Sequence, residues 1–167
     1  GLSLKDWRSN GVHILICTQR NGGWSMDGLP VVDWLDKTID QLRKFTDRPI
    51  IVRGHPGDKH AVKYLNKKKY TVSTNPKITQ DFTNAWATVT YNSSPGVASA
   101  IEGIPLFVTD PNPRISQAFP VANTDLSQIE TPDIFERQNW IEKLAMSHWK
   151  FQELTDGSAW AHMREYV

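Results

Sequence analysis

The sequence predicts an α/β domain in which helices cover both faces of a parallel sheet. Short apolar runs rich in β-branched residues recur along the chain, as expected of strands buried on both faces. Between them lie segments whose apolar residues follow the helical period, and strands that alternate with helices in this way pair in parallel. The expected strands are residues 12–17, 49–53, 70–73, 87–91 and 105–108.

The expected helices follow from the same spacing rule. Residues 33–45 are the clearest case, with Trp34, Leu35 and Ile39 on one face. Residues 115–132 are expected to be irregular because Pro120 and Pro132 interrupt long helices. The other expected helices are residues 58–67, 78–86, 97–102 and a long one at 133–154. The order of elements predicts a Rossmann-like domain.

Size and composition narrow the class of protein. A chain of 167 residues that is 39% hydrophobic is expected to form one domain, residues 1–167, with C-terminal helices from about residue 133. Its 19 basic and 18 acidic residues leave a net charge of +1, which argues against a dedicated nucleic-acid or membrane-surface binder. The single cysteine, Cys17, excludes an internal disulfide and is expected to be a buried structural thiol.

Several motifs are missing, and their absence limits the chemistry. No apolar run approaches the ~20 residues that span a bilayer, and no secretory signal is present, so a cytoplasmic protein without a membrane span is expected. The five histidines do not fall at metal-ligand spacing, so no metal site is expected. Neither a Gly-x-Gly-x-x-Gly motif, a P-loop nor a Gly-x-Ser-x-Gly elbow occurs, so a dinucleotide cofactor and a serine nucleophile are not expected.

Polar side chains cluster in the loops that follow the expected strands. Because the carboxyl ends of parallel strands meet at one edge of a sheet, these loops are expected to form a shared pocket. Ser93 and Ser94 lie in a turn before a helix, where hydroxyls, free N–H groups and the helix dipole suit a phosphate. An ordinary helix N-cap is the alternative reading of these serines. The candidates at this edge are Arg20, Arg53, His55, Pro56, Asn92, Ser93, Ser94, Gly96, Asp110 and Arg114.

Three motifs carry a family resemblance. They are Arg-Gly-His-Pro at 53–56, Ser-Ser-Pro-Gly at 93–96 and Ala-Ile-Glu-Gly-Ile-Pro at 100–105. Together they resemble the C-terminal, nucleotide-sugar-binding half of GT-B glycosyltransferases. The resemblance is to the capsule-polysaccharide-synthesis group, which includes the Kdo transferases, and to bacterial sialyltransferases with His-Pro and Ser-Ser motifs.

The resemblance implies one half of a GT-B architecture that binds a nucleotide-sugar donor, a CMP- or UDP-sugar, without a metal or other cofactor. In those families the His-Pro histidine and the serine pair hold the nucleotide phosphate, which implies this role for His55–Pro56 and Ser93–Ser94. His55 is then the catalytic residue that stabilises the departing phosphate. Arg53 and Gly96 complete the expected phosphate site. Further candidate donor contacts are Arg20, Asn92, Glu102, Asp110 and Arg114.

One departure from the family pattern affects the ribose. Many relatives have Glu-Ala before the Gly-x-Pro, with the glutamate near the ribose, whereas Ser99-Ala100 stands here. Glu102 lies one helical turn further on.

The partners and the reaction stay open at the level of sequence. A GT-B enzyme has two Rossmann-like domains, so the acceptor half is expected from a second domain or from a homo-oligomer, and helix 133–154 would pack toward it. A nucleotide-sugar 2-epimerase and a teichoic-acid glycerophosphotransferase look similar over the same motifs. A non-catalytic domain that binds a nucleotide or a protein partner is the alternative from another class.

Overall fold

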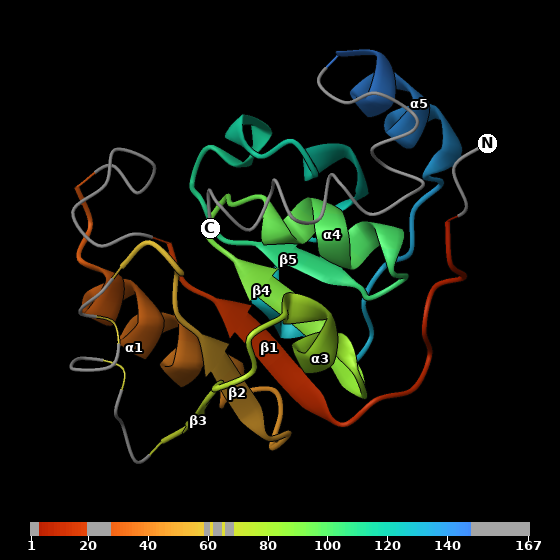
Figure 1. Cartoon of the computed structure of the whole chain (residues 1–167). Coiled ribbons are helices and arrows are strands. Elements are labelled where there is room, and N and C mark those ends of the chain that lie inside the picture. Colours follow the sequence, from red (N-terminus) through yellow and green to blue (C-terminus); the bar gives the residue numbers. More distant parts are fainter. Residues whose placement is uncertain (1–3, 20–27, 59–60, 62–64, 66–68, 148–167) are drawn as a thin grey trace.

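The computed structural model describes residues 4–19, 28–58, 61, 65 and 69–147, and its centre is a parallel sheet (Figure 1). Within these residues the sheet has five strands in the order β3-β2-β1-β4-β5, and every neighbouring pair is parallel. The strands are β1 (His13–Cys17), β2 (Ile50–Arg53), β3 (Thr71–Val72), β4 (Ala85–Thr90) and β5 (Leu106–Val108). The expected Rossmann-like α/β fold is therefore confirmed.

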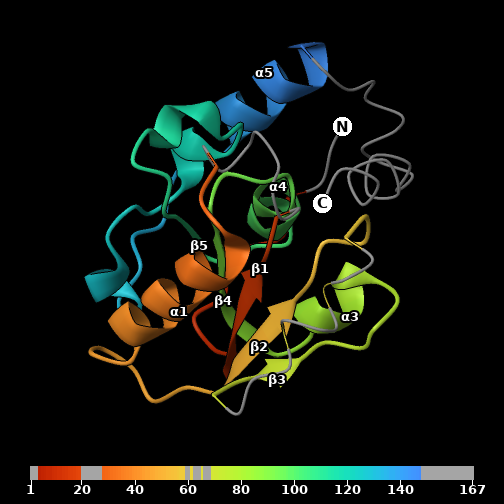
Figure 2. The ribbon, with the colours of Figure 1, turned by 90° about the vertical axis from the view of Figure 1, so that its left-hand side faces the viewer.

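Helices cover both faces of this sheet. Figure 2 shows α1 (Val31–Leu42) on one side, and α3 (Ile78–Phe82) and α4 (Pro95–Ile101) on the other. α5 (Gln138–Ser147) packs into the same apolar cluster as α3 and α4. Short 3-10 helices at Pro113–Ile115, Phe119–Val121 and Leu126–Gln128 connect β5 to α5.

The core divides into two clusters because successive strand side chains point to opposite faces. Ile14 and Ile16 pack with α1 on one face, while Leu15 and Cys17 pack with α3, α4 and α5 on the other. These four side chains of β1 are fully buried. β1 therefore lies at the centre of both layers, as its uninterrupted apolar sequence predicts.

The expected helix at residues 78–86 is wrong at its C-terminal end. α3 stops at Phe82, Asn84 takes a left-handed backbone conformation with φ 64°, and β4 begins at Ala85. Trp86 is thus a strand residue beside an irregularity in the β1–β4 register. Its indole N–H donates to the Ile129 carbonyl at 2.7 Å.

The expected long helix at 133–154 also begins too early. α5 starts at Gln138, and the Asn123 side chain holds the preceding segment out of a helix. Its Oδ1 accepts from the Asp133 N–H at 2.9 Å, and its Nδ2 donates to the Asp133 carbonyl at 3.1 Å. The part of this helix after residue 147, and most of the helix at 58–67, lie outside the described residues. No helix in the described part is long and apolar enough to cross a membrane.

Candidate functional site

The carboxyl edge of the sheet contains a topological switch point. From β1 the chain moves outward to β2 and β3, then returns to β4 and β5 on the other side of β1. The loops that follow β1 and β4 therefore leave the sheet in diverging directions, and in open α/β sheets ligands bind in the crevice between such loops. A hydrogen bond joins these two loops, since the Asn92 N–H donates to Gln19 Oε1 at 2.7 Å.

His55 lies in the loop after β2, and a backbone N–H of the same loop holds its side chain. The Gly57 N–H donates to Nδ1 at 2.8 Å, so in the neutral ring the proton resides on Nε2. A Cβ at Gly57 would lie 2.9 Å from His55 Cε1, which is why glycine fits here. The side chain is buried at 8% exposure, and Pro56 beside it is exposed. The loop thus fixes the tautomer in which Nε2 is the donor.

The turn before α4 differs from both sequence-based readings. The Gly96 N–H donates to the Ser93 carbonyl at 3.1 Å, and the Val97 N–H donates to the Ser94 carbonyl at 2.9 Å. The expectation of free N–H groups is therefore wrong at Gly96 and Val97, and Pro95 has no N–H to offer. The N-cap alternative is also wrong, because the Ser94 side chain makes no capping hydrogen bond.

Ser93 carries an unsatisfied hydroxyl. Its Oγ is buried and has no hydrogen-bond partner within the described part of the chain. Gly96 has a packing role, since a Cβ there would lie 3.0 Å from Leu106 Cδ2, so glycine lets α4 approach β5 closely. Of the expected phosphate-binding groups in this turn, the Ser93 hydroxyl is thus a buried group that a ligand would satisfy.

Asn92 and Asp110 join the loops after β4 and β5. Asn92 Nδ2 donates to Asp110 Oδ2 at 2.8 Å, and the Asn112 N–H donates to Asp110 Oδ1 at 2.8 Å. Both carboxylate oxygens of Asp110, which is 5% exposed, are therefore used within the protein. Arg114 lies exposed on the 3-10 helix that follows the same loop.

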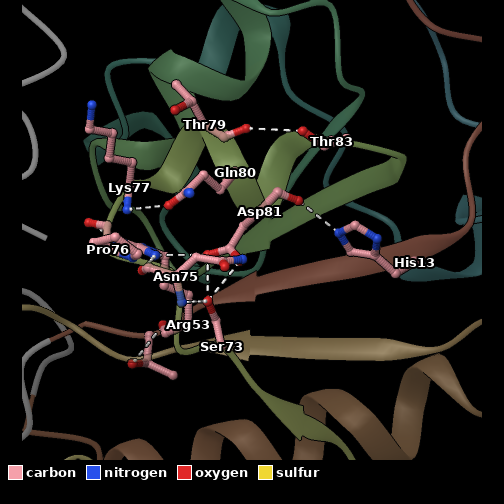
Figure 3. Close-up of polar contacts among 11 residues, drawn as sticks. His13, Arg53, Ser73, Asn75, Pro76, Lys77, Thr79, Gln80, Asp81 and Thr83 are labelled. Atoms are coloured by element: carbon pink, nitrogen blue, oxygen red, sulfur yellow. Dashed lines mark hydrogen bonds and ion pairs between the residues drawn. The ribbon is translucent and has the colours of Figure 1, made fainter.

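Arg53 takes part in a buried polar network (Figure 3). Its Nη1 donates to Asp81 Oδ2 at 2.8 Å and to the Asn75 carbonyl at 2.8 Å. Asp81 also accepts from the Ser73 hydroxyl at 2.7 Å and from Asn75 Nδ2 at 2.7 Å. Arg53 is 7% exposed and Asp81 2%. The guanidinium thus holds α3 and the loop after β3 against β2.

One further candidate is not placed with these loops. Glu102 caps the C-terminal end of α4, the end away from Ser93 and Ser94, and accepts from Lys5 Nζ at 2.7 Å. Arg20 lies outside the described residues.

A cavity of about 380 Å³, which sequence reasoning missed, adjoins the same edge. Trp34 of α1, Tyr91 and Thr109 are among its lining residues. Trp34 is read from the sequence only as a core residue of an amphipathic helix. The sequence feature that could have indicated this cavity is the position of Tyr91 and Thr109 directly after β4 and β5.

The side chains described at the carboxyl edge of the sheet can offer a ligand hydrogen-bond donors and acceptors. Burial raises the pKa of the Cys17 thiol from 9.0 to about 12, with Arg53 opposing and Asp81 reinforcing the shift. This thiol is therefore protonated at neutral pH and is not a nucleophile. Among the described residues, no group of three or more His, Cys, Asp or Glu side chains is placed to hold a metal ion.

No protein-family model and no curated protein matches this sequence.

Proposed function

We propose that this chain is the donor-binding domain of a glycosyltransferase and takes a CMP- or UDP-sugar at the carboxyl edge of its sheet. The observation that supports this most is the position of two loops. His55 follows β2 and Ser93–Ser94 follow β4, so the two motifs flank the end of β1 where the strand order reverses. That crevice is where open α/β sheets bind nucleotides.

The hydrogen-bonding state of these side chains suits an anionic phosphate. With Nδ1 accepting from Gly57, the His55 Nε2–H is a donor. The unpartnered Ser93 hydroxyl would gain a hydrogen bond by turning into another staggered rotamer toward a phosphate oxygen. Donors that meet the charge developing on a leaving phosphate lower the barrier to transfer, and losing one costs about 10²–10³ in kcat. His55 is the catalytic residue in this proposal.

Arg53 is assigned a structural role beside the phosphate site, because its guanidinium pairs with Asp81. The Asn92–Asp110 hydrogen bond positions the turn that carries the serines. Arg114, which is exposed after β5, is the positively charged side chain that we assign to binding of the donor. The acceptor and the catalytic base come from a second domain or a second copy of the chain.

Calorimetric titration with CMP-, UDP- and GDP-sugars tests the proposal. His55→Asn keeps an oxygen that can accept from the Gly57 N–H, but it lacks a donor at the position of the His55 Nε2–H. His55→Gln restores an amide N–H donor at that position. We expect one class of nucleotide sugar to bind, His55→Asn to bind it about 10- to 100-fold more weakly, and His55→Gln to recover part of the loss.

Ser94→Ala is compared with Ser9→Ala, an exposed serine in the N-terminal segment. The first is expected to weaken binding and the second to leave it unchanged. No binding of any nucleotide sugar at millimolar concentration, or equal binding by wild type and His55→Asn, would contradict the proposal. Product analysis with the bound donor then separates sugar transfer from epimerisation and from phosphoglycerol transfer.

A further inference from the structure

The cavity beside α1 has the composition of a separate binding site. It lies between α1 and the segment that follows β5, which runs alongside α1 in Figure 2. Its volume of about 380 Å³ is at the lower end of the range for ligand pockets, roughly 300–1,000 Å³, and suits one ring better than an extended chain.

Two aromatic residues and a hydroxyl line the inner part of this cavity. The rings of Trp34 and Tyr91 meet edge to face, with centroids 6.3 Å apart at 86°, and each residue is 4% exposed. The Trp34 indole N–H donates to Thr109 Oγ1 at 2.8 Å. Since that oxygen is the acceptor, the Thr109 hydroxyl keeps its own proton to donate. The inner wall thus combines two aromatic side chains with a hydroxyl donor.

The outer part is polar, with one charge of each sign. Lys37 and Gln41 are exposed on α1, and Asp125 is exposed across the cavity. Hydrogen bonds from the Ser127 side chain and backbone hold the pKa of Asp125 below its usual value, so it is an ionised acceptor. The two charges offset each other, so neither an anion nor a cation is favoured. Several donors and acceptors around a small apolar wall match a neutral ligand with many hydroxyls.

We propose that this cavity binds a neutral saccharide ring. Tyr91 directly precedes Asn92 and Thr109 directly precedes Asp110, so the cavity adjoins the hydrogen-bonded pair that links the loops after β4 and β5. Under the proposed function, the bound sugar is one ring of the acceptor that the second domain or second copy presents, and that role rests on the proposed function. The saccharide binding itself does not.

Saturation-transfer NMR on the whole chain, without nucleotide, tests this proposal. The probes are methyl glycosides of neutral hexoses and N-acetylhexosamines, with sialic acid as the anionic comparison. The variants Lys37→Ala and Gln41→Ala change exposed residues of α1 and are expected to fold. Lys44→Ala, exposed just beyond α1 and absent from the cavity lining, is the matched control.

We expect a neutral glycoside to bind wild type and Lys44→Ala with equal affinity at millimolar concentration. Its affinity for Gln41→Ala should be lower by about fivefold or more. Sialic acid is expected to bind more weakly than the neutral glycosides. No transfer to any neutral glycoside, equal affinity in the cavity variants, or a preference for sialic acid overturns the proposal.

A nucleotide titration of the same variants separates the two proposals. If Lys37→Ala and Gln41→Ala abolish nucleotide binding, the cavity belongs to the donor and the saccharide proposal fails. If His55→Asn leaves nucleotide binding unchanged while the glycoside still binds wild type and not Gln41→Ala, the proposed function fails and the saccharide site stands.

Discussion

Arg53 Nη1 lies 2.8 Å from Asp81 Oδ2, and these two side chains form a buried ion pair between the end of β2 and α3. The side chains are 9% and 1% exposed. An arginine at the start of an Arg-Gly-His-Pro motif is expected to meet phosphate, but here its charge is matched inside the protein. The pair therefore governs stability and the placement of α3.

Breaking this pair is expected to destabilise the fold strongly. Arg53→Met and Asp81→Asn should each lower the free energy of unfolding by about 3–5 kcal/mol, because each leaves a buried polar partner without its counterpart. Urea denaturation measures this loss. Asp40→Asn, which removes the exposed Lys69–Asp40 pair at 3.6 Å, is the control and should change stability by less than about 1 kcal/mol. A similarly small change in Asp81→Asn would contradict the structural role.

Ser93→Ala should separate stability from binding. Removing a buried hydroxyl that has no partner is expected to leave the melting temperature unchanged or raise it, while nucleotide affinity falls. Thr90→Val is the matched control, since Thr90 Oγ1 is also buried and unpartnered but lies within β4. It should have the same effect on stability and none on nucleotide affinity. Equal nucleotide affinity in wild type and Ser93→Ala would remove Ser93 from the site.

The strands could be predicted because their signal is local. β1 and β5 are short apolar runs, and burial on both faces makes such runs continuous. The helix ends could not be predicted in the same way. Phe82 and Trp86 are four residues apart and imitate a helical face, but Asn84 turns left-handed between them. The start of α5 depends on Asn123, which bonds to Asp133 across ten residues of chain.

The order of the strands predicts which edge of the sheet carries the candidate site. It does not predict which hydrogen-bond partners the groups at that edge have. The motifs place His55 and the serines in loops at one edge. Nothing in them shows that Asp81 pairs with Arg53, or that Gly96 and Val97 donate to backbone carbonyls. The cavity beside Tyr91 depends on how α1 meets the segment after β5, which is a property of tertiary packing alone.

Gly103 is expected to be intolerant of a side chain. Its φ is +80°, and a Cβ there would overlap the Asp6 carbonyl oxygen of the N-terminal segment. Gly28 has a similar φ of +78°, and no atom of the described residues lies within 4 Å of its Cβ position, so Gly28→Ala reports mainly the backbone cost, about 1–2 kcal/mol. Gly103→Ala should lose clearly more in the free energy of unfolding. Equal losses in thermal denaturation would show that the N-terminal segment does not pack there.

Stability should fall at alkaline pH, and Cys17 should account for part of the loss. Burial raises the pKa of the thiol from 9.0 to about 12, so the folded state binds its proton more tightly than the unfolded state does. This contribution is complete below pH 9 and is lost as pH rises from 9 toward 12, at no more than about 1.4 kcal/mol per pH unit.

The comparison is between wild type and Cys17→Ala, with the slope of unfolding free energy against pH as the readout. The variant should have a shallower slope above pH 9. Tyr70 sustains a remaining slope, because burial, and then Asp36, raise its pKa from 10.0 to about 12. Identical slopes above pH 9 would contradict a buried, protonated Cys17.

The most direct test of the donor site is to map amide chemical shifts while a CMP- or UDP-sugar is added to the labelled chain. We expect the amides of residues 18–19, 54–55, 57 and 92–94 to shift together along one binding curve, and this pattern to disappear in His55→Asn. Shifts confined to one loop, shifts centred on Lys5 and Glu102 at the far end of α4, or no saturable shift at millimolar nucleotide sugar would contradict it.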